Sequence, residues 1–418
     1  IGRAHLGAGP STLVRDNRMR RLRGLLFSIL ALTAIELQAS RLSAQDTPKD
    51  TTKAKADTQP APPPQPAAPS LPFDFSGILY ANYQYGGNKG NRTVDRFDVD
   101  RAYLTFRATP GEHFAVRITA DVYQQRDTTR DQYYRGWALR AKYAYGQYDF
   151  IRGVGDELKA NVRLGLLQTV IIDHEEQFWQ RGLSQVAIEQ NGFFSSSDAG
   201  AATTITFPKK YGEIYATITN GSGYGSREVD RFKDYQARLT LTPLMNTFGF
   251  WKTLTISPWY SKGDRASDFA RGQGTLDPVT DALRRDRGGV FLGLRDPRMT
   301  LGAQLAERWD VFESADTTVD VVPRSVERTG QVISLYTIFR PLAFINSAPT
   351  WPIAVTLRAD NIKNDTDRDP YARYYIAGLG WEFNRRTSVT FDFQTQEPKS
   401  GSTAADTKVF FIHLIAGF

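Results

Sequence analysis

From residue 73 to the end of the chain, apolar and polar residues alternate with a period of two. Residues 114–122 show the pattern clearly, because Phe114 and Ile118 share one face with other apolar residues while Arg117 lies on the opposite face. Successive side chains of a strand point to opposite faces of its sheet, so the period predicts strands with one apolar and one polar face. No stretch of helical period interrupts the pattern. The sequence therefore predicts an all-β fold.

Three further stretches repeat the alternation, at 137–145, 160–166 and 235–241. In the first stretch, the predicted apolar face consists of Trp137, Leu139, Ala141, Tyr143 and Tyr145. The opposite face there carries Arg140 and Lys142. A soluble β-sandwich shows the same alternation, so the period does not by itself separate a sandwich from a membrane barrel.

Sixteen such segments can be placed along the chain. They lie near 73–85, 94–108, 113–125, 135–150, 159–169, 198–207, 210–220, 231–242, 251–262, 288–296, 298–311, 329–340, 352–362, 371–384, 387–397 and 407–418. Several are longer than the five or six residues usual in soluble sheets, and about ten residues cross a bilayer when a strand is tilted. An even number of strands is typical of bacterial transmembrane barrels. We therefore expect a transmembrane antiparallel β-barrel of about sixteen strands.

The connections between these strands alternate in length. Tight turns are predicted at 109–112, 208–209, 297 and 384–386, and long polar loops at 170–197, 263–287, 312–328 and 398–406. In transmembrane barrels the short turns lie on the periplasmic side and the long loops outside. Two turns, 151–158 and 341–351, are longer than this rule predicts.

The last strand ends on an aromatic residue. Its apolar face is formed by Phe410, Ile412, Leu414, Ala416 and Phe418. An apolar alternation that stops at a terminal Phe resembles the signal by which outer-membrane proteins are passed to their assembly machinery. Phe418 is therefore the candidate assembly signal.

Residues 19–44 have the layout of a cleavable secretory signal peptide. A basic segment begins at Met19, an apolar run of twelve residues covers 24–35, and the small residue Ala44 marks the expected cleavage site. Twelve apolar residues are too few to span a bilayer as a helix. The segment predicts export and a location in the outer membrane of a Gram-negative cell.

The remaining N-terminal residues divide into two parts. Residues 1–18 precede the first suitable start methionine and are interpreted as an upstream, non-native extension. Residues 45–71 include seven of the chain's 21 prolines, a composition that favours a solvated periplasmic linker over a folded domain. The barrel is therefore expected at 72–418.

The net charge of +7 gives little information about partners. Residues 1–71 contain ten basic and five acidic residues, which leaves 42 basic and 40 acidic residues in the rest of the chain. This balance does not predict a nucleic-acid partner. The chain has no cysteine, so it offers neither a disulfide nor a thiolate metal site, and no motif indicates a cofactor or a metal.

Two blocks of sequence carry a family resemblance. Residues 96–106 (RFDVDRAYLTF) with 111–118 (GEHFAVRI), and residues 163–169 (RLGLLQT) with 176–181 (EQFWQR), resemble the phosphate-selective porins O and P. The resemblance covers about residues 73–225, and the rest of the chain shares the layout alone. It implies a homotrimer of sixteen-stranded pores in outer-membrane lipid, with the loop after the fifth strand folded into the lumen. Here that loop is 170–197.

Members of that family which select phosphate line their pores with arginines. The basic residues that parity places inside this barrel are Arg101, Arg107, Arg117, Arg140, Lys142, Arg163, Arg238 and Arg358. Residues of the inward loop that are candidates for a constriction are Asp173, His174, Glu175, Glu176 and Arg181. Guanidinium groups along a pore lower the barrier to anions, and their fork suits phosphate oxygens.

Acidic residues on the same face provide an alternative interpretation. Parity places four of them inside: Asp121, Asp360, Glu382 and Asp392. Because buried charges need partners, the arginines and these acids are as readily explained as ion pairs that stiffen the wall. The two interpretations stay open at this level.

The sequence thus predicts a porin for passive diffusion of small hydrophilic solutes, with a preference for anions such as phosphate. One alternative is an outer-membrane transporter of hydrophobic compounds, which the proline-rich 45–71 disfavours because it cannot form a packed plug. Another is a barrel hydrolase or adhesin. His413 faces the lumen by parity, but no nucleophile accompanies it in the sequence, so no catalytic residue is predicted.

Overall fold

The computed structural model describes residues 73–88, 94–124, 136–153, 157–228, 230–247, 249–266, 282–314, 324–345, 352–367, 369–384, 386–402 and 404–418. Two units can be separated along the chain, 1–68 and 69–418, and every described residue belongs to the second. The predicted extension, signal peptide and linker therefore lie outside the described residues.

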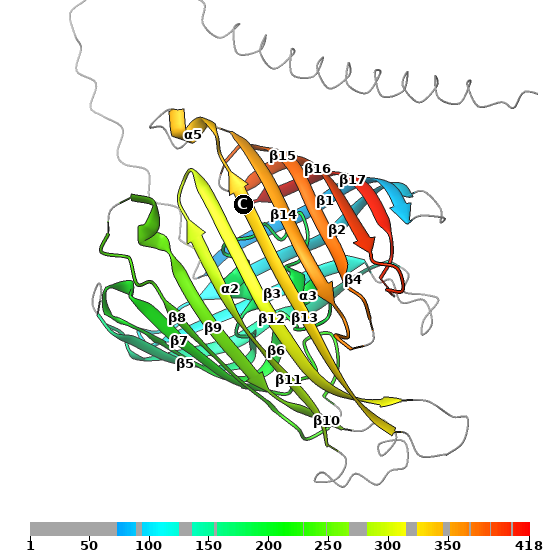
Figure 1. The fold of residues 1–418 in the computed structure, drawn as a ribbon. Coiled ribbons are helices and arrows are strands. Elements are labelled where there is room, and N and C mark those ends of the chain that lie inside the picture. Colours follow the sequence, from blue (N-terminus) through cyan, green and yellow to red (C-terminus); the bar gives the residue numbers. More distant parts are fainter. Residues whose placement is uncertain are drawn as a thin grey trace, which may run out of the picture. The chain divides into compact units, whose positions relative to one another are not determined.

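The second unit is a closed antiparallel β-barrel (Figure 1). Its strands are β1 (Asp74–Asn88), β2 (Val94–Ala108), β3 (Phe114–Gln124), β4 (Trp137–Ile151), β5 (Lys159–Gln168), β6 (Ser197–Thr206), β7 (Gly212–Thr219), β8 (Asp234–Leu241), β9 (Thr255–Lys262), β10 (Asp264–Ala266), β11 (Ala282–Arg295), β12 (Met299–Ser314), β13 (Arg324–Phe339), β14 (Ile353–Lys363), β15 (Ala372–Glu382), β16 (Thr387–Pro398) and β17 (Thr407–Gly417). β1 pairs with both β2 and β17, which closes the sheet. β9 and β10 are separated by Gly263 alone and both pair with β11, so they form one stave of a sixteen-stranded barrel.

The connections differ between the two ends of the barrel. At one end, here called the short-turn end, lie the connections β2–β3, β6–β7, β11–β12 and β15–β16 and the chain's C-terminus. Two connections at this end are longer and include short helices, η2 (Gly249–Thr253) between β8 and β9 and α5 (Leu342–Ile345) between β13 and β14. The opposite end, called the loop end, carries the β5–β6 and β7–β8 connections. No helix among the described residues is long and apolar enough to cross a membrane.

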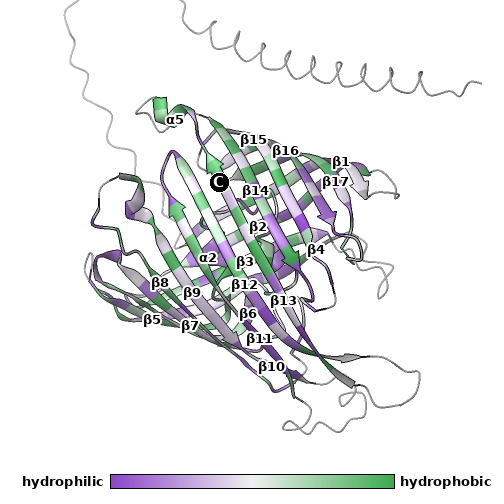
Figure 2. Cartoon of the chain, viewed as in Figure 1, coloured by the Kyte–Doolittle hydropathy of each residue, from purple (hydrophilic) through white to green (hydrophobic). Residues whose placement is uncertain are grey.

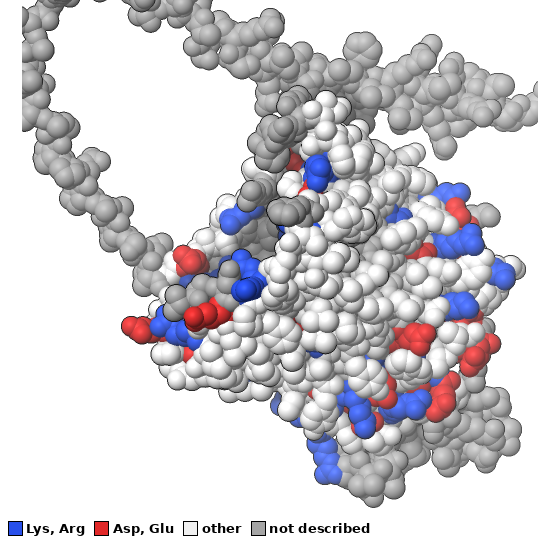
Figure 3. Space-filling model, turned by 60° about the vertical axis from the view of Figure 1, so that its left-hand side comes forward, with Lys and Arg blue, Asp and Glu red and all other residues white. Residues whose placement is uncertain are grey.

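The two faces of the wall have opposite character. On one face, bulky apolar side chains are exposed, among them Phe97, Ile118, Leu139, Leu164 and Leu335. On the other face, polar side chains are buried, among them Thr119, Asp121, Arg238, Arg358 and Gln394. Because the barrel is closed, the exposed face is the outer wall and the buried face lines the lumen. The alternation appears as stripes along the strands (Figure 2), and a broad part of the outer wall shows no charged side chain (Figure 3). Such a wall is stabilised by lipid rather than by water.

Aromatic residues join the first and last strands at the short-turn end. The ring of Phe75 packs against Phe106 and Phe418, with centroid distances of 4.7 and 5.6 Å. The backbones of Gly77 and Phe418 exchange two hydrogen bonds, of 3.3 and 3.0 Å. The terminal Phe is thus part of the barrel seam, and its role as an assembly signal stays a prediction.

The all-β barrel and its sixteen staves confirm the sequence-based fold prediction. One assignment of side chains to faces is wrong. Thr119 pairs with Tyr143 but Ala120 pairs with Ala141, so Lys142 is the extra residue of a β-bulge. A bulge reverses the alternation beyond it. Tyr143 and Tyr145 therefore lie on the lumen face, instead of sharing the outer face with Trp137.

The starts of β11 and β13 differ most from the predicted strand starts. β11 begins at Ala282 rather than 288, and β13 begins at Arg324 rather than 329, so the loops predicted at 263–287 and 312–328 are shorter. The charged run at the start of β11 was interpreted as loop because it lacks apolar alternation. In the structure its backbone pairs with β12, which extends the hairpin toward the loop end.

Candidate functional site in the barrel lumen

The connection between β5 and β6, here called segment 169–196, has an apolar core. It contains two short helices, α2 (Ile172–Glu175) and α3 (Ala187–Gln190). The aromatic contacts between the segment and the wall are Phe178 with Phe291, Trp179 with Tyr336, and Phe194 with Trp259, at centroid distances of 5.2, 4.9 and 5.4 Å. A connection is present where the loop at 170–197 was predicted, but it is not a polar loop, because apolar residues such as Ile171 and Ile172 are completely buried.

Wall side chains also hold the segment through its backbone. Carbonyls of the segment accept hydrogen bonds as follows: Val170 from Arg238, Leu183 from Gln394 (3.0 Å), Gln185 from Arg358 (2.7 Å) and Phe193 from Arg287 (2.7 Å). A buried carbonyl without a partner would cost free energy, so each bond stabilises the position of the segment. Three of the donors are arginines, so some of their N–H groups bind the segment and are not free to bind a solute.

The middle of the segment lies against the opposite strands. A Cβ atom added to Gly182 would lie 2.5 Å from the side chain of Ile415 on β17 and 2.7 Å from that of Tyr80 on β1. No larger residue fits this approach without rearrangement. Together with the contacts above, segment 169–196 contacts lumen-facing residues of β1, β8, β9, β11, β13, β14, β16 and β17.

Arg181 forms a buried ionic cluster within the segment. Its guanidinium group contacts Glu176 and lies 2.6 Å from a carboxylate oxygen of Glu189. Burial works against the charge of Arg181, but the two carboxylates outweigh it and raise its pKa. Two predicted constriction residues, Glu176 and Arg181, thus neutralise each other.

The other three predicted constriction residues make different contacts. Asp173 accepts a hydrogen bond of 3.0 Å from Tyr143, and His174 Nε2 lies 2.9 Å from Ser257 Oγ. Burial, and to a lesser degree Arg238, lower the pKa of His174 well below its usual value, so its ring is neutral at pH 7. Of these three residues, Asp173 is half-buried, whereas His174 and Glu175 are buried.

Glu175 is the least satisfied group of the segment. Its side chain is completely buried, and neither carboxyl oxygen has a hydrogen-bond partner among the described residues. Burial raises the pKa of Glu175 to about 8; Arg358 lowers it, while Asp360 and Glu176 add to the increase. At neutral pH the group is therefore mostly protonated.

Several of the predicted lining cations are paired. Arg101 and Arg140 share Asp121 Oδ2, at 3.1 and 3.0 Å. Arg238 contacts Glu213, and Arg358 lies 2.7 Å from Asp360. Lys142 hydrogen-bonds the hydroxyl of Tyr103 at 3.3 Å. For these arginines the structure favours the ion-pair interpretation.

The remaining predicted acids are satisfied as well. Glu382 is held by Arg340, with two hydrogen bonds of 2.8 Å. Asp392 lies 3.1 Å from His413 Nε2 and accepts a hydrogen bond from Gln394. All four predicted acids thus have a charged or ring-nitrogen partner.

Four of the predicted lining cations lack such a partner among the described residues: Lys142, which donates only to the Tyr103 hydroxyl, and three arginines. No carboxylate of a described residue lies within ion-pair distance of Arg107, Arg117 or Arg163. The last two donate to neutral groups instead: Arg117 to Thr119 at 3.2 Å, and Arg163 to Gln147 at 2.8 Å. The guanidinium groups of Arg117 and Arg163 also lie over tyrosine rings, 4.4 Å from Tyr143 and 5.4 Å from Tyr145.

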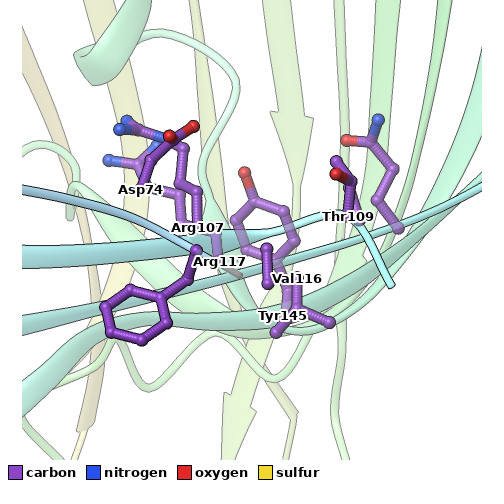
Figure 4. A pocket seen from close by; sticks show the side chains of 10 residues that line it. Asp74, Arg107, Thr109, Val116, Arg117 and Tyr145 are labelled. Atoms are coloured by element: carbon purple, nitrogen blue, oxygen red, sulfur yellow. The ribbon is translucent and has the colours of Figure 1, made fainter. Parts of the chain in front are cut away.

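These three arginines come from β2, β3 and β5, near the short-turn end. A cavity of about 470 Å³ opens there, lined by Asp74, Arg107, Arg117, Tyr145 and Gln147 among others (Figure 4). A second cavity of about 520 Å³ lies at the loop end and carries both charges, with Arg227, Glu228, Asp264 and Arg285 in its lining. The predicted lining cations that lack a carboxylate partner among the described residues therefore lie in one arc, β2–β5.

Sequence reasoning missed an ionic cluster on β11 and β12. Arg287 contacts Asp310 and is buried, and Arg308 lies over the ring of Phe193 at 4.4 Å. Arg287 was assigned to a loop because the start of β11 was placed too late. Arg308 and Asp310 lie on the same face of β12 as the buried Gln304, and this shared parity in the sequence indicates that they face the lumen.

The described residues offer little for catalysis or metal binding. His413 is buried and stacks on Phe411, with ring centroids 4.8 Å apart. No serine or threonine hydroxyl among the described residues forms a hydrogen bond with it. The described residues include no group of three or more potential ligands that could hold a metal ion.

Comparison with known proteins relates the chain to porins through its fold. No protein-family model matches the sequence, and no curated protein matches it. Three similar solved structures are OmpF of Salmonella typhi (12% identity, TM-score 0.55), OprB of Pseudomonas putida (10%, 0.55) and the outer membrane channel DcaP of Acinetobacter baumannii (11%, 0.53). Each alignment covers 83% of this chain and 97%, 94% and 97% of the other chains, respectively. The fold is that of the outer-membrane porins.

Proposed function

We propose that the chain is an outer-membrane porin through which small hydrophilic solutes diffuse passively, with a preference for anions. The observation that carries the preference is the arc β2–β5, where Arg107, Arg117 and Arg163 face the lumen and no described carboxylate pairs with them. Positive side chains along a narrow aqueous path lower the barrier for anions and raise it for cations. Phosphate is one anion that these guanidinium groups could hold.

In this proposal, segment 169–196 lies inside the barrel and forms the constriction. Its apolar core packs against β9–β13, so the path for solutes runs along the arc of unpaired arginines. A barrel of sixteen strands is wide enough for an aqueous lumen, and the segment reduces that width. The outer apolar wall fits outer-membrane lipid, and assembly as a homotrimer through the outer-membrane assembly machinery belongs to the same proposal.

The test is the zero-current potential of single channels in a planar bilayer under a KCl gradient, repeated with added phosphate. We expect anion selectivity that is strongly reduced in the triple variant R107Q/R117Q/R163Q, because that variant removes the three guanidinium groups of the arc that lack a carboxylate partner and leaves the ion pairs of the other lining arginines intact. Block of the chloride current by phosphate would extend the preference to phosphate. Cation selectivity would refute the anion preference, and absence of conductance would refute the porin function.

A further inference from the structure

Four side chains form a row across the first four strands at the short-turn end. The strand registers place Asp74 opposite Arg107, Arg107 opposite Arg117, and Arg117 opposite Tyr145. Directly opposed residues of antiparallel strands have Cβ atoms about 5 Å apart. All four line the cavity of about 470 Å³ (Figure 4), a volume typical of small-molecule sites.

The charges of this row do not cancel. Two like charges in directly opposed positions destabilise a strand pair, and here both are arginines. Asp74 forms no ion pair within 4.0 Å with any described residue, and Arg107 makes no hydrogen bond to one. Arg117 uses Nε alone, toward Thr119. Most donor groups of two neighbouring guanidinium groups are therefore unused beside the cavity.

We propose that this row is a binding site for small monocarboxylic acids that carry a hydroxyl group. This assignment rests on the proposed porin function, which it deepens. Arg107 and Arg117 bind the carboxylate, since the planar guanidinium fork matches its two oxygens. The negative charge of the solute offsets the repulsion between the two arginines, and the Tyr145 hydroxyl supplies a further donor.

Asp74 defines which acids fit. It is acceptor-only when ionised, so it accepts a hydrogen bond from a solute hydroxyl and repels a second negative charge. The row thus selects a singly charged hydroxy acid over a dianion.

The test is single-channel conductance in planar bilayers, with potassium lactate as the probe and potassium succinate as the dianion. We expect conductance to saturate with lactate concentration, and the half-saturating concentration to increase about tenfold or more in R107Q/R117Q, because each hydrogen bond to a charged group contributes measurably to binding. D74N is expected to weaken discrimination against succinate. A linear dependence on lactate in the unaltered protein would overturn the site while leaving a conducting porin.

Arg163→Gln is the matched control. It removes the same charge from the same arc, but Arg163 reaches the row only indirectly, through the Tyr145 ring and Gln147. We therefore expect lower anion selectivity and a much smaller shift of the half-saturating concentration than in R117Q. An equal shift in R163Q and R117Q would mean that the field of the arc acts without a site, and would overturn the proposal. Absence of any conductance in the unaltered protein would instead refute the porin function.

Discussion

The arc β2–β5 and the arc β9–β14 of the same lumen use their arginines differently. On β11 and β14, Arg287 and Arg358 each contact an aspartate and donate to a carbonyl of segment 169–196. On β2 and β3, Arg107 and Arg117 have neither a carboxylate nor a segment carbonyl as partner among the residues that the structure describes. Arginine content alone therefore does not identify a solute path. What matters is whether each guanidinium group is already satisfied by the protein.

The largest expected effect concerns Glu175, on the packed side of this comparison. A carboxyl group whose pKa is raised from 4.5 to about 8 by burial binds its proton more tightly when the segment is packed. Packing is thus fully stabilised below pH 4.5 and loses stability as the pH rises to about 8. At 1.36 kcal/mol per pKa unit, the loss amounts to about 5 kcal/mol. We expect the single-channel conductance to be higher at pH 9 than at pH 5, and to fluctuate more in time.

Glu175→Gln is the control for this prediction. Glutamine has nearly the same shape and stays neutral, so the variant should show the same conductance at pH 5 and pH 9. Arg358, Asp360 and Glu176 face the same position and remain in the variant, which isolates the contribution of Glu175. Identical pH profiles for the variant and the unaltered protein would contradict the assignment.

A smaller effect is expected when an apolar contact of the packed arc is removed. Trp179 is 2% exposed, packs on Tyr336 and donates a hydrogen bond of 2.9 Å to the carbonyl of Ser184. Replacing a buried Trp with Ala costs about 3–5 kcal/mol. We expect W179A to loosen the segment, so that limited proteolysis cleaves it and conductance increases, while the barrel keeps its strand pairing.

Trp251→Ala is the matched control for W179A. Trp251 is 57% exposed, in η2 at the short-turn end, and its ring packs on Phe250. Its removal should leave both proteolysis and conductance unchanged. If W251A and W179A behave alike, the segment is not held by its apolar core.

The sequence allowed the wall to be predicted more fully than the lumen. The parity that placed Arg117, Arg163 and Arg358 inside depends on local alternation, which a strand must obey. The bulge at Lys142 could not be predicted, because it depends on how β3 and β4 align. It moved Tyr143 and Tyr145 to the lumen, where they lie beside Arg117 and Arg163.

The core of segment 169–196 left a usable signal that the loop assignment overlooked. The apolar pairs Ile171–Ile172 and Phe178–Trp179 are unusual in an exposed polar loop, so they indicate burial. Which arginines are satisfied could not be inferred in the same way. Arg358 and Asp360 are two residues apart on one strand, whereas Arg101 and Asp121 meet through cross-strand packing.

The smallest expected effect tests what distinguishes the arginines of the solute path from those of the packed arc. The distinguishing feature is either the ion pair with a carboxylate or the place of the arginine in the barrel. Asp121 is completely buried and is shared by Arg101 and Arg140 on the solute side of the barrel, so it offsets one of their two charges. Asp121→Asn keeps the shape and removes the carboxylate charge, so one further positive charge becomes uncompensated. The gain in anion selectivity should be about two- to threefold, because Arg140 stays stacked between Tyr123 and Tyr224, at 4.1 and 4.3 Å, and hydrogen-bonded to the latter. The measurement is again the zero-current potential, with D360N as the counterpart on the packed arc. An equal gain in both variants would show that the path is not confined to the β2–β5 side, since Asp360 pairs with an arginine that holds the segment.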